Sequence, residues 1–330
     1  MPPRDRDRFE LISPERANSA ASFAEEVQAG LTAAQKSLPC RFLYDEAGSR
    51  LFEEICDLPE YYPTRTERSI LERRAEELAR SFAEPASLVE LGSGSASKTR
   101  ILIEALLKRQ RQLTFSPVDI SRSALRDSTA ALLEDYPGLR IRAVEGEYDR
   151  ALHCIREASH APTLVLWLGS SIGNLDRPEA IRFVARLRAE MVENDRLLVG
   201  VDLRKERRTL ERAYDDARGV TARFNLNLLA RIDRELGGEF RDGSFRHRAV
   251  YREDSGRVEL HLVSQTRQRV RIEKLDLVVE FEAGETIHTE NSYKYSLDEI
   301  DALAVESGMT LEAQWLDERK WFSVNLFAPA

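Results

Sequence analysis

The feature of this sequence that most constrains its fold is a series of short apolar segments separated by stretches with helical spacing of apolar residues. These apolar segments are predicted strands, and they cover residues 87–91, 115–120, 139–144, 163–168 and 196–201. Helices are predicted between them, for example over residues 98–107 and 123–135. Continuous apolar strands that alternate with helices indicate a parallel sheet covered on both faces. The sequence therefore predicts an α/β fold.

The pattern changes in the last third of the chain. Residues 204–236 are predicted to be helical and highly charged, and residues 257–289 alternate apolar and polar positions with period two. Such alternation is typical of antiparallel strands with one face exposed to water. A helix follows, which is predicted to begin at the capping box Ser296-Leu297-Asp298-Glu299. Two strands at 309–316 and 321–327 are then predicted to form an antiparallel hairpin. We expect the first domain to be built from two segments, separated by an insertion that belongs to a second domain.

Composition excludes several classes of protein. The chain has 330 residues, with 49 basic and 57 acidic side chains, and the net charge of −8 argues against a nucleic-acid-binding protein. Cys40, Cys56 and Cys154 lie far apart without a C-x-x-C motif, and the five histidines lack metal-ligand spacing, so we expect no disulfide framework and no metal site. No signal peptide and no apolar run of membrane-spanning length is present, so we expect a cytoplasmic protein that does not contact membranes.

The turn after the first predicted strand indicates a ligand site. Gly92-Ser93-Gly94 follows the strand directly, and glycines at such a turn allow the backbone to approach a ligand closely. Dinucleotides and S-adenosylmethionine both bind in this way. Ser97 stands where a dinucleotide-binding turn has its third glycine, which favours S-adenosylmethionine. Glu90, which leads into the turn, and Asp119, at the end of the second strand, suit the polar groups of such a ligand.

Two later strand ends add candidate residues. At the third strand, Glu147 can accept from an adenine amino group while Tyr148 covers the ring. After the fourth strand, Gly169 permits close approach of a substrate, and the amide of Asn174 can both donate and accept hydrogen bonds. This edge of an open α/β sheet is where ligands bind.

Taken together, these segments resemble the histidine-specific N-alpha-methyltransferases of ergothioneine biosynthesis. The residues that carry the resemblance extend from Tyr44 to the final hairpin and comprise Tyr44-Asp45-x-x-Gly48-Ser49, Leu58-Pro59-Glu60-Tyr61-Tyr62-Pro63-Thr64-Arg65, Glu90-Leu91-Gly92-Ser93-Gly94, Leu168-Gly169-Ser170-Ser171-Ile172-Gly173-Asn174, Tyr214-Asp215-Asp216 and Thr289-Glu290-x-Ser292. The family converts L-histidine into its trimethylated betaine, hercynine, with S-adenosylmethionine as the methyl donor. The resemblance implies a Rossmann-type class I methyltransferase domain with a C-terminal antiparallel hairpin, and a second, α+β, substrate-binding domain.

The resemblance also implies domain boundaries and site residues. The substrate-binding domain is expected at residues 1–63 and 204–293, and the S-adenosylmethionine-binding domain at residues 64–203 and 294–330. The implied cofactor contacts are Tyr44, Gly92, Lys98, Asp119, Glu147 and Tyr148. The implied substrate contacts are Tyr61, Gly169, Asn174, Tyr214, Leu260, Glu290 and Ser292.

The sequence departs from the family pattern at two places. Glu147-Tyr148 replaces the usual Asp-Phe, and the longer acid can still reach an adenine amine. Leu260 stands where a methionine often lines the imidazole pocket, and this change roughly conserves volume.

The side chains at these positions suit methyl transfer to an α-amine. Tyr44 is the candidate catalytic residue, which positions the amine directly or through water, because a phenol is a weak base at neutral pH. The aromatic faces of Tyr44, Phe52 and Tyr61 can stabilise a methylated cation. Glu290 and Ser292, two apart on an extended segment, would point the same way and bond an imidazole.

Three alternatives remain open from the sequence. A methyltransferase of the same build could act on another amino acid or a histidine derivative, and an NAD-dependent oxidoreductase is disfavoured by Ser97. A non-catalytic binding module is disfavoured because the substrate positions are chemically competent. We expect a monomer whose only partner is the small-molecule substrate.

Overall fold

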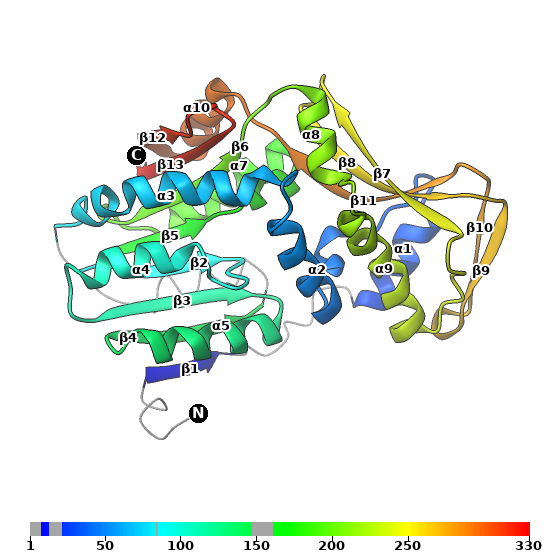
Figure 1. Cartoon of the computed structure of the whole chain (residues 1–330), viewed down its shortest axis with the longest axis horizontal. Helices are drawn as coiled ribbons and strands as arrows, with labels where there is room; N and C mark the ends of the chain where they lie inside the picture. The colour runs from blue at the N-terminus through cyan, green and yellow to red at the C-terminus, as the bar shows by residue number, and fades with distance from the viewer. Residues whose placement is uncertain (1–7, 13–21, 84, 147–160) are drawn as a thin grey trace. The chain divides into compact units, whose positions relative to one another are not determined.

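The computed structural model describes residues 8–12, 22–83, 85–146 and 161–330 (Figure 1). The chain divides into two compact units. Unit 1 consists of Met1–Glu15, Pro63–Arg204 and Lys294–Ala330, and unit 2 of Arg16–Tyr62 and Lys205–Tyr293.

Unit 1 is built on a mixed sheet that has eight strands among the described residues. Their order is β1-β4-β3-β2-β5-β6-β13-β12. The bounds are β1 Phe9–Ile12, β2 Ser87–Leu91, β3 Leu113–Asp119, β4 Leu139–Glu145, β5 Thr163–Trp167, β6 Arg196–Asp202, β12 Met309–Leu316 and β13 Phe322–Pro329. The strands β1 to β6 pair in parallel, whereas β13 is antiparallel to both β6 and β12. Since β2 lies between β3 and β5, the strand order reverses at β2 and β5, which is where open α/β sheets bind ligands.

The five predicted parallel strands correspond to β2 through β6, and the predicted hairpin corresponds to β12 and β13. The α/β class is therefore confirmed. The N-terminal boundary differs from our expectation. We assigned residues 1–63 to the second domain, but Phe9–Ile12 pairs with Ile141–Val144 of β4 and extends the sheet of unit 1. A strand of four residues flanked by charged side chains has too short an alternation of apolar and polar positions to be recognised from the sequence.

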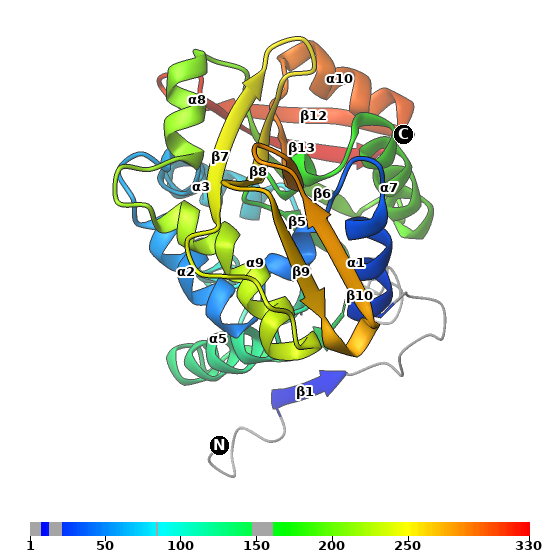
Figure 2. The ribbon, with the colours of Figure 1, turned by 90° about the vertical axis from the view of Figure 1, so that its right-hand side faces the viewer.

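Helices cover both faces of this sheet. Their bounds are α3 Tyr62–Arg80, α4 Thr99–Leu107, α5 Arg122–Asp135, α7 Arg177–Glu190 and α10 Leu297–Glu306. The views show α3 and α5 on one side of the sheet, and α7 and α10 on the other (Figures 1 and 2). Asp176 and Ser296 begin α7 and α10 with capping boxes, which satisfy backbone N–H groups that the helix itself leaves without acceptors.

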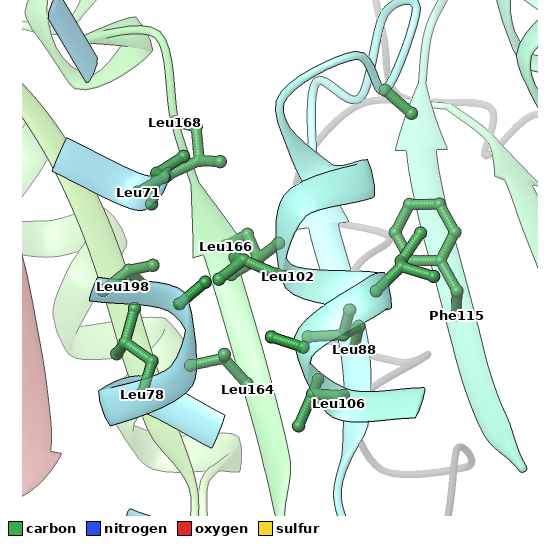
Figure 3. Packing of buried hydrophobic residues seen from close by; sticks show 14 of the residues in the cluster. Leu71, Leu78, Leu88, Leu102, Leu106, Phe115, Leu164, Leu166, Leu168 and Leu198 are labelled. Atoms are coloured by element: carbon green, nitrogen blue, oxygen red, sulfur yellow. The ribbon is translucent and has the colours of Figure 1, made fainter. Parts of the chain in front are cut away.

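The core of unit 1 fills the space between the sheet and the helices α3 and α4. Leucines at helical spacing point from each helix onto apolar side chains of the strands (Figure 3). The labelled residues are Leu71, Leu78, Leu102, Leu106, Leu88, Phe115, Leu164, Leu166, Leu168 and Leu198. Burial of each such side chain contributes about 1.5–3 kcal/mol, so this packing fixes α3 and α4 against the sheet.

Unit 2 combines helices with two small antiparallel sheets. Its helices are α1 Phe23–Thr32, α2 Glu46–Cys56, α8 Arg207–Tyr214 and α9 Val220–Leu236. One sheet has the order β11-β8-β7, and the other pairs β10 with β9. The strand bounds are β7 Phe245–Arg252, β8 Arg257–Ser264, β9 Gln268–Ile272, β10 Leu277–Phe281 and β11 Thr286–Tyr293.

Two segments of unit 2 differ from the expectation. Residues 204–236, expected to be one helical stretch, form α8 and α9, separated by a turn in which the Asp216 carboxylate accepts from Val220 N at 3.0 Å and Thr221 N at 2.8 Å. The composition of residues 42–49 and 58–63 is typical of turns and predicts loops. The structure has α2 in this part of the chain, and the helix begins after Asp45, whose carboxylate accepts from Gly48 N at 2.8 Å. A Cβ at Gly48 would lie 1.7 Å from Leu43 O, so only glycine permits this approach.

Within the described part of the chain, no helix combines the length and the apolar character that a membrane span requires.

Candidate functional site

The glycine-rich turn of unit 1 is held by the neighbouring strand. Gly92 and Gly94 have φ of 71° and 49°, a left-handed conformation that favours glycine. The N–H groups of Gly92 and Ser93 donate to Val118 O at 2.8 and 3.2 Å. The turn after β2 is therefore tied to the end of β3, at the carboxyl edge of the sheet.

Asp119 fixes the same turn through its side chain. Its carboxylate accepts from Gly94 N at 2.8 Å and from Ser121 N at 2.8 Å. Burial raises the pKa of Asp119, while the hydrogen bonds from Ser121 and Gly94 act in the opposite direction. A carboxylate accepts more than two hydrogen bonds, so Asp119 can hold the loop and also accept from a ligand hydroxyl.

Glu90 provides a test of whether the site fits S-adenosylmethionine. One carboxyl oxygen accepts from Thr99 Oγ1 at 2.6 Å, and the other, Oε2, is buried without a partner among the described residues. Burial raises the pKa of Glu90 to about 8, against the lowering effects of the Thr99 hydrogen bond and of Lys98. An orphaned buried acceptor is rare unless a ligand or water completes it. The amino and hydroxyl groups of S-adenosylmethionine suit such an acceptor.

A buried ion pair lies beside this turn. Glu67 of α3 is fully buried, and its carboxylate accepts from Gly169 N at 2.9 and 3.0 Å and pairs with the ammonium of Lys98. In the sequence, Thr64-Arg65-Thr66-Glu67 has the pattern of a capping box and predicts that a helix begins there. That interpretation is wrong, because α3 begins at Tyr62 and the Glu67 side chain points into the core.

The loop after β5 has the conformation expected of a close-approach site. Gly169 and Ser170 both have positive φ, of 75° and 59°. The 3-10 helix η3 (Ser171–Asn174) follows and leaves Asn174 half-buried. Glu147 and Tyr148 lie outside the described residues.

Aromatic rings gather in unit 2. Tyr44 lies 5.4 Å from both Phe52 and Phe224, measured between ring centroids, with edge-to-face geometry. Phe52 contacts Tyr61 at 6.2 Å, and Tyr61 contacts Tyr214 at 5.9 Å. The three predicted aromatic residues are therefore neighbours, and the two others join the same cluster. Such ring faces suit a methylated cation.

The sheet of unit 2 presents Leu260, Glu290 and Ser292 on one face. Glu290 is in register with Leu260, and Ser292 with Val258. A β-bulge at Thr289 makes this possible, because without it Glu290 would share a face with His288. Thr289 Oγ1 donates to Leu260 O at 3.1 Å and holds the bulge. The Glu290 side chain is buried, with 8% exposure.

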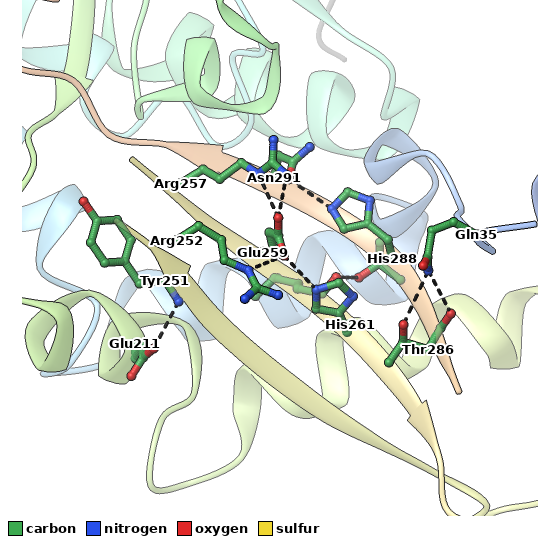
Figure 4. A network of polar contacts seen from close by, with 12 residues as sticks. Gln35, Glu211, Tyr251, Arg252, Arg257, Glu259, His261, Thr286, His288 and Asn291 are labelled. Carbon is green, nitrogen blue, oxygen red and sulfur yellow. Dashed lines mark hydrogen bonds and ion pairs between the residues drawn. The ribbon is translucent and has the colours of Figure 1, made fainter. Parts of the chain in front are cut away.

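The opposite face of this sheet carries a separate polar network (Figure 4). There Glu259 accepts hydrogen bonds from Arg252 and Arg257 and lies 3.2 Å from His261 Nε2. Burial alone would raise the pKa of Glu259, but these partners lower it to about 2. His288 contacts His261 with a centroid distance of 5.3 Å. This network supports the sheet and shares no residue with the predicted site.

A hydrogen-bond chain orients Tyr214. Its hydroxyl lies 2.8 Å from Ser292 Oγ, and its carbonyl oxygen lies 2.8 Å from His247 Nε2. The other ring nitrogen of His247 lies 3.0 Å from Asn225 Nδ2, which is a donor, so His247 carries its proton on Nε2 and donates to Tyr214. Burial lowers the pKa of His247 and keeps the ring neutral.

The structure thus divides the predicted residues into two groups. Unit 1 contains Gly92, Lys98, Asp119, Gly169 and Asn174, whereas unit 2 contains Tyr44, Tyr61, Tyr214, Leu260, Glu290 and Ser292. Tyr44, a predicted cofactor contact, lies in the same unit as most predicted substrate contacts. Gly169 and Asn174, predicted substrate contacts, lie in the same unit as the glycine-rich turn.

Comparison with known proteins decides the family. The model of the family described as "Histidine-specific methyltransferase, SAM-dependent" matches residues 23–329. The chain belongs to this family. Like its members, it depends on S-adenosylmethionine, and the family assignment replaces the oxidoreductase and binding-module alternatives.

Individual relatives of this histidine-specific methyltransferase cover nearly the whole chain. It is 43% identical over 309 residues to the histidine N-alpha-methyltransferase of Mycolicibacterium smegmatis, covering 94% of this chain and 95% of that protein. The corresponding protein of Mycobacterium tuberculosis is 42% identical over 303 residues, with 92% and 94% covered. Ergothioneine biosynthesis protein 1 of Schizosaccharomyces pombe is 30% identical over 280 residues, with 82% of this chain and 36% of that longer protein covered.

Sequence reasoning missed several residues that the structure places at these two groups. Phe224 and His247 had no signal, because a helical Phe and a strand His are typical of core or solvated positions, and the capping-box pattern indicated a different role for Glu67. Their partners become visible only when distant segments meet.

Proposed function

We propose that this methyltransferase transfers methyl groups successively from S-adenosylmethionine to the α-amine of L-histidine and forms N-alpha,N-alpha,N-alpha-trimethyl-L-histidine for ergothioneine biosynthesis. The observation that carries the proposal is the buried carboxylate of Glu290 on the same sheet face as Ser292. An acceptor buried in this way favours a substrate side chain that donates hydrogen bonds, as imidazole does, and disfavours an apolar one.

S-adenosylmethionine supplies a methyl group already activated by its sulfonium. In the proposal, unit 1 holds this donor with the turn at Gly92, the carboxyl groups of Asp119 and Glu90, and Lys98. The unpartnered Oε2 of Glu90 supports this assignment, because it is an acceptor that the described protein groups leave unused. Glu147 and Tyr148 remain proposed adenine contacts.

We assign the recognition of histidine to Glu290, Ser292 and Leu260 for the imidazole, and to Tyr214 and Asn174 for the carboxylate. The Tyr214 hydroxyl is held by Ser292 and its backbone by His247, so its position is fixed before a substrate binds. Preorganised polar groups lose little entropy on binding, which favours a specific site.

The α-amine is mostly protonated at neutral pH and must lose a proton before each transfer. We assign its positioning to Tyr44, directly or through water. Burial, together with nearby Tyr214 and Cys56, raises the pKa of Tyr61 well above its ordinary value, so Tyr61 stays a neutral phenol. Tyr61 therefore orients or contacts the substrate and does not act as a base. The rings of Tyr44, Phe52 and Tyr61 stabilise the growing cationic character of the product.

The test is a panel of free amino acids incubated with labelled S-adenosylmethionine, with mass spectrometry of the products. We expect label in mono-, di- and trimethylated histidine alone, and selective transfer to another amino acid would reject histidine as the substrate. Glu290→Gln should weaken histidine binding at least tenfold while donor binding stays unchanged. His288→Ala is the matched control, since His288 lies on the opposite face of the same strand.

Two further properties belong to the proposal. We expect a monomer, which sedimentation equilibrium would test, and a cytoplasmic location, which fractionation of the source cells would test. A pocket adapted to a different amino acid or a histidine derivative is the alternative, and the same panel identifies it.

A further inference from the structure

We propose that Glu67 is a positioning residue for methyl transfer: from α3 it holds Lys98 and the Gly169 loop in one arrangement and so determines how tightly the donor binds. The inference rests on the proposed function only in taking S-adenosylmethionine as the donor. Glu67 is not among the site residues that were assigned above from the sequence or from the family resemblance.

The burial of Glu67 is the first observation. Its side chain has no exposed surface, although it lies on a helix whose other acidic residues are mostly exposed. A carboxylate buried without partners is strongly unfavourable. Here Gly169 N donates to it and the Lys98 ammonium pairs with it, so the charge is matched by two groups at the ligand edge of the sheet.

The backbone of β6 leaves a space for this carboxylate. Gly200 lies two residues before the end of β6, and a Cβ at that position would be 1.8 Å from Glu67 Oε1. From α3, the carboxylate therefore contacts the start of α4, the loop after β5 and the strand β6 at once. A shift of Glu67 would disturb all three.

Both partners of Glu67 need to be held. Lysine has a flexible four-carbon side chain and loses rotamer entropy when it is fixed. The Gly169–Ser170 backbone has two consecutive left-handed residues, and Ser170 is not a glycine, so this conformation persists only where surrounding bonds impose it. The hydrogen bond from Gly169 N to Glu67 holds the first of these residues in the left-handed conformation. The hydrogen bond from Asp202 N to Ser170 Oγ, at 2.9 Å, holds the second.

Glu67 also acts electrostatically on the orphaned acceptor of the donor site. The negative charge of Glu67 raises the pKa of Glu90, and the positive charge of Lys98 lowers it. Removal of the Glu67 charge should therefore move the pH dependence of donor binding toward lower pH. A residue that only packed the core would not change this profile.

The experiment is a double-mutant cycle measured by calorimetric titration of S-adenosylmethionine and S-adenosylhomocysteine. Glu67→Gln should weaken binding of both about 10- to 100-fold and shift the pH profile downward. In the Lys98→Met background the same substitution should have a clearly smaller effect than in the wild type, because the part of the Glu67 contribution that passes through Lys98 is already lost. Glu72→Gln, an exposed acid on the same helix, is the matched control and should bind both ligands normally.

Independent, multiplying effects of the two substitutions, or unchanged donor binding in Glu67→Gln, would overturn the proposal. Gly200→Ala is a second approach, since it displaces the Glu67 carboxylate without removing it, and it should also weaken donor binding. If neither Glu67→Gln nor Gly200→Ala folds, as judged by tryptophan fluorescence, Glu67 is assigned to stability and the proposal fails. Donor binding does not depend on the methyl acceptor, so activity toward another amino acid would leave this result intact.

Discussion

Replacement of Glu90 by glutamine should stabilise the protein relative to the wild type, by an amount that grows as pH rises. The same substitution should weaken the binding of S-adenosylmethionine. Glu90 is buried with 3% exposure at the end of β2, and its only hydrogen bond to a described residue comes from Thr99. A glutamine has the same shape and keeps an oxygen acceptor for Thr99. It cannot ionise, so it removes the cost of a buried charge. Destabilising groups of this kind are common where function needs them.

The sign and size follow from the shift of the Glu90 pKa from 4.5 to about 8. The folded state keeps a proton that the unfolded chain releases near its ordinary pKa. Stability therefore falls as pH rises above the unfolded pKa, and the loss is complete above the folded pKa. Each pH unit well inside this window costs about 1.4 kcal/mol, and the slope is smaller near each pKa, so the wild-type chain loses about 3.5 kcal/mol between about pH 5 and pH 8 relative to Glu90→Gln.

Urea unfolding followed by tryptophan fluorescence measures this difference selectively. The three tryptophans of the chain, Trp167, Trp315 and Trp321, all belong to unit 1, as does Glu90. The comparison of the two proteins at each pH cancels the titration of other groups. Glu72→Gln is again the control, and its stability difference from wild type should stay near zero throughout.

A stability gap that stays constant from about pH 5 to pH 8 would refute the reasoning, because it would mean that Glu90 ionises in the folded state as easily as in the unfolded chain. The same variant should bind S-adenosylmethionine more weakly than wild type does. Greater stability together with weaker binding would identify Glu90 as a group kept for its ligand.

Three further predictions concern other parts of the chain. Lys294→Met removes the ammonium that lies 2.8 Å from the buried Asp202 carboxylate and should lower the free energy of unfolding by about 3–5 kcal/mol in urea, and a loss below about 1 kcal/mol would contradict a tightly coupled pair. Ser292→Ala removes the hydroxyl bonded to Tyr214 and should reduce histidine affinity about 3- to 10-fold by calorimetry, with donor affinity as the internal control. Leu260→Met conserves volume and should change stability by less than about 1.5 kcal/mol and the histidine KM by less than about threefold, whereas a larger KM change would show that this position sets substrate choice.

Local patterns predicted the elements of unit 1 well, because the physical signal for each lay within a few neighbouring residues. The mainly apolar segment Ser87–Leu91 has the bounds of β2, since a strand buried on both faces is built mostly from apolar residues. The glycine turn after it has the positive φ values that its composition indicates. Asp176 caps α7, as the order Asp-Arg-Pro-Glu predicts.

Other features depended on contacts between distant segments. The Thr289 bulge, which places Glu290 on the same sheet face as Leu260, depends on pairing with β8 and leaves no local signature in the sequence. Glu67 reads as a helix cap, yet packing against Gly200 and Gly169 buries it. The pKa of Glu90 is set by burial, which is a property of the assembled core.

The sequence by itself thus determined the order of strands and helices, the glycine turn and the chemistry of the side chains available at strand ends, because propensity and periodicity are local. Only the tertiary structure decided which carboxylates are buried, which partners hold them and which sheet face Glu290 occupies, because these depend on side chains that are close in space and far apart along the chain.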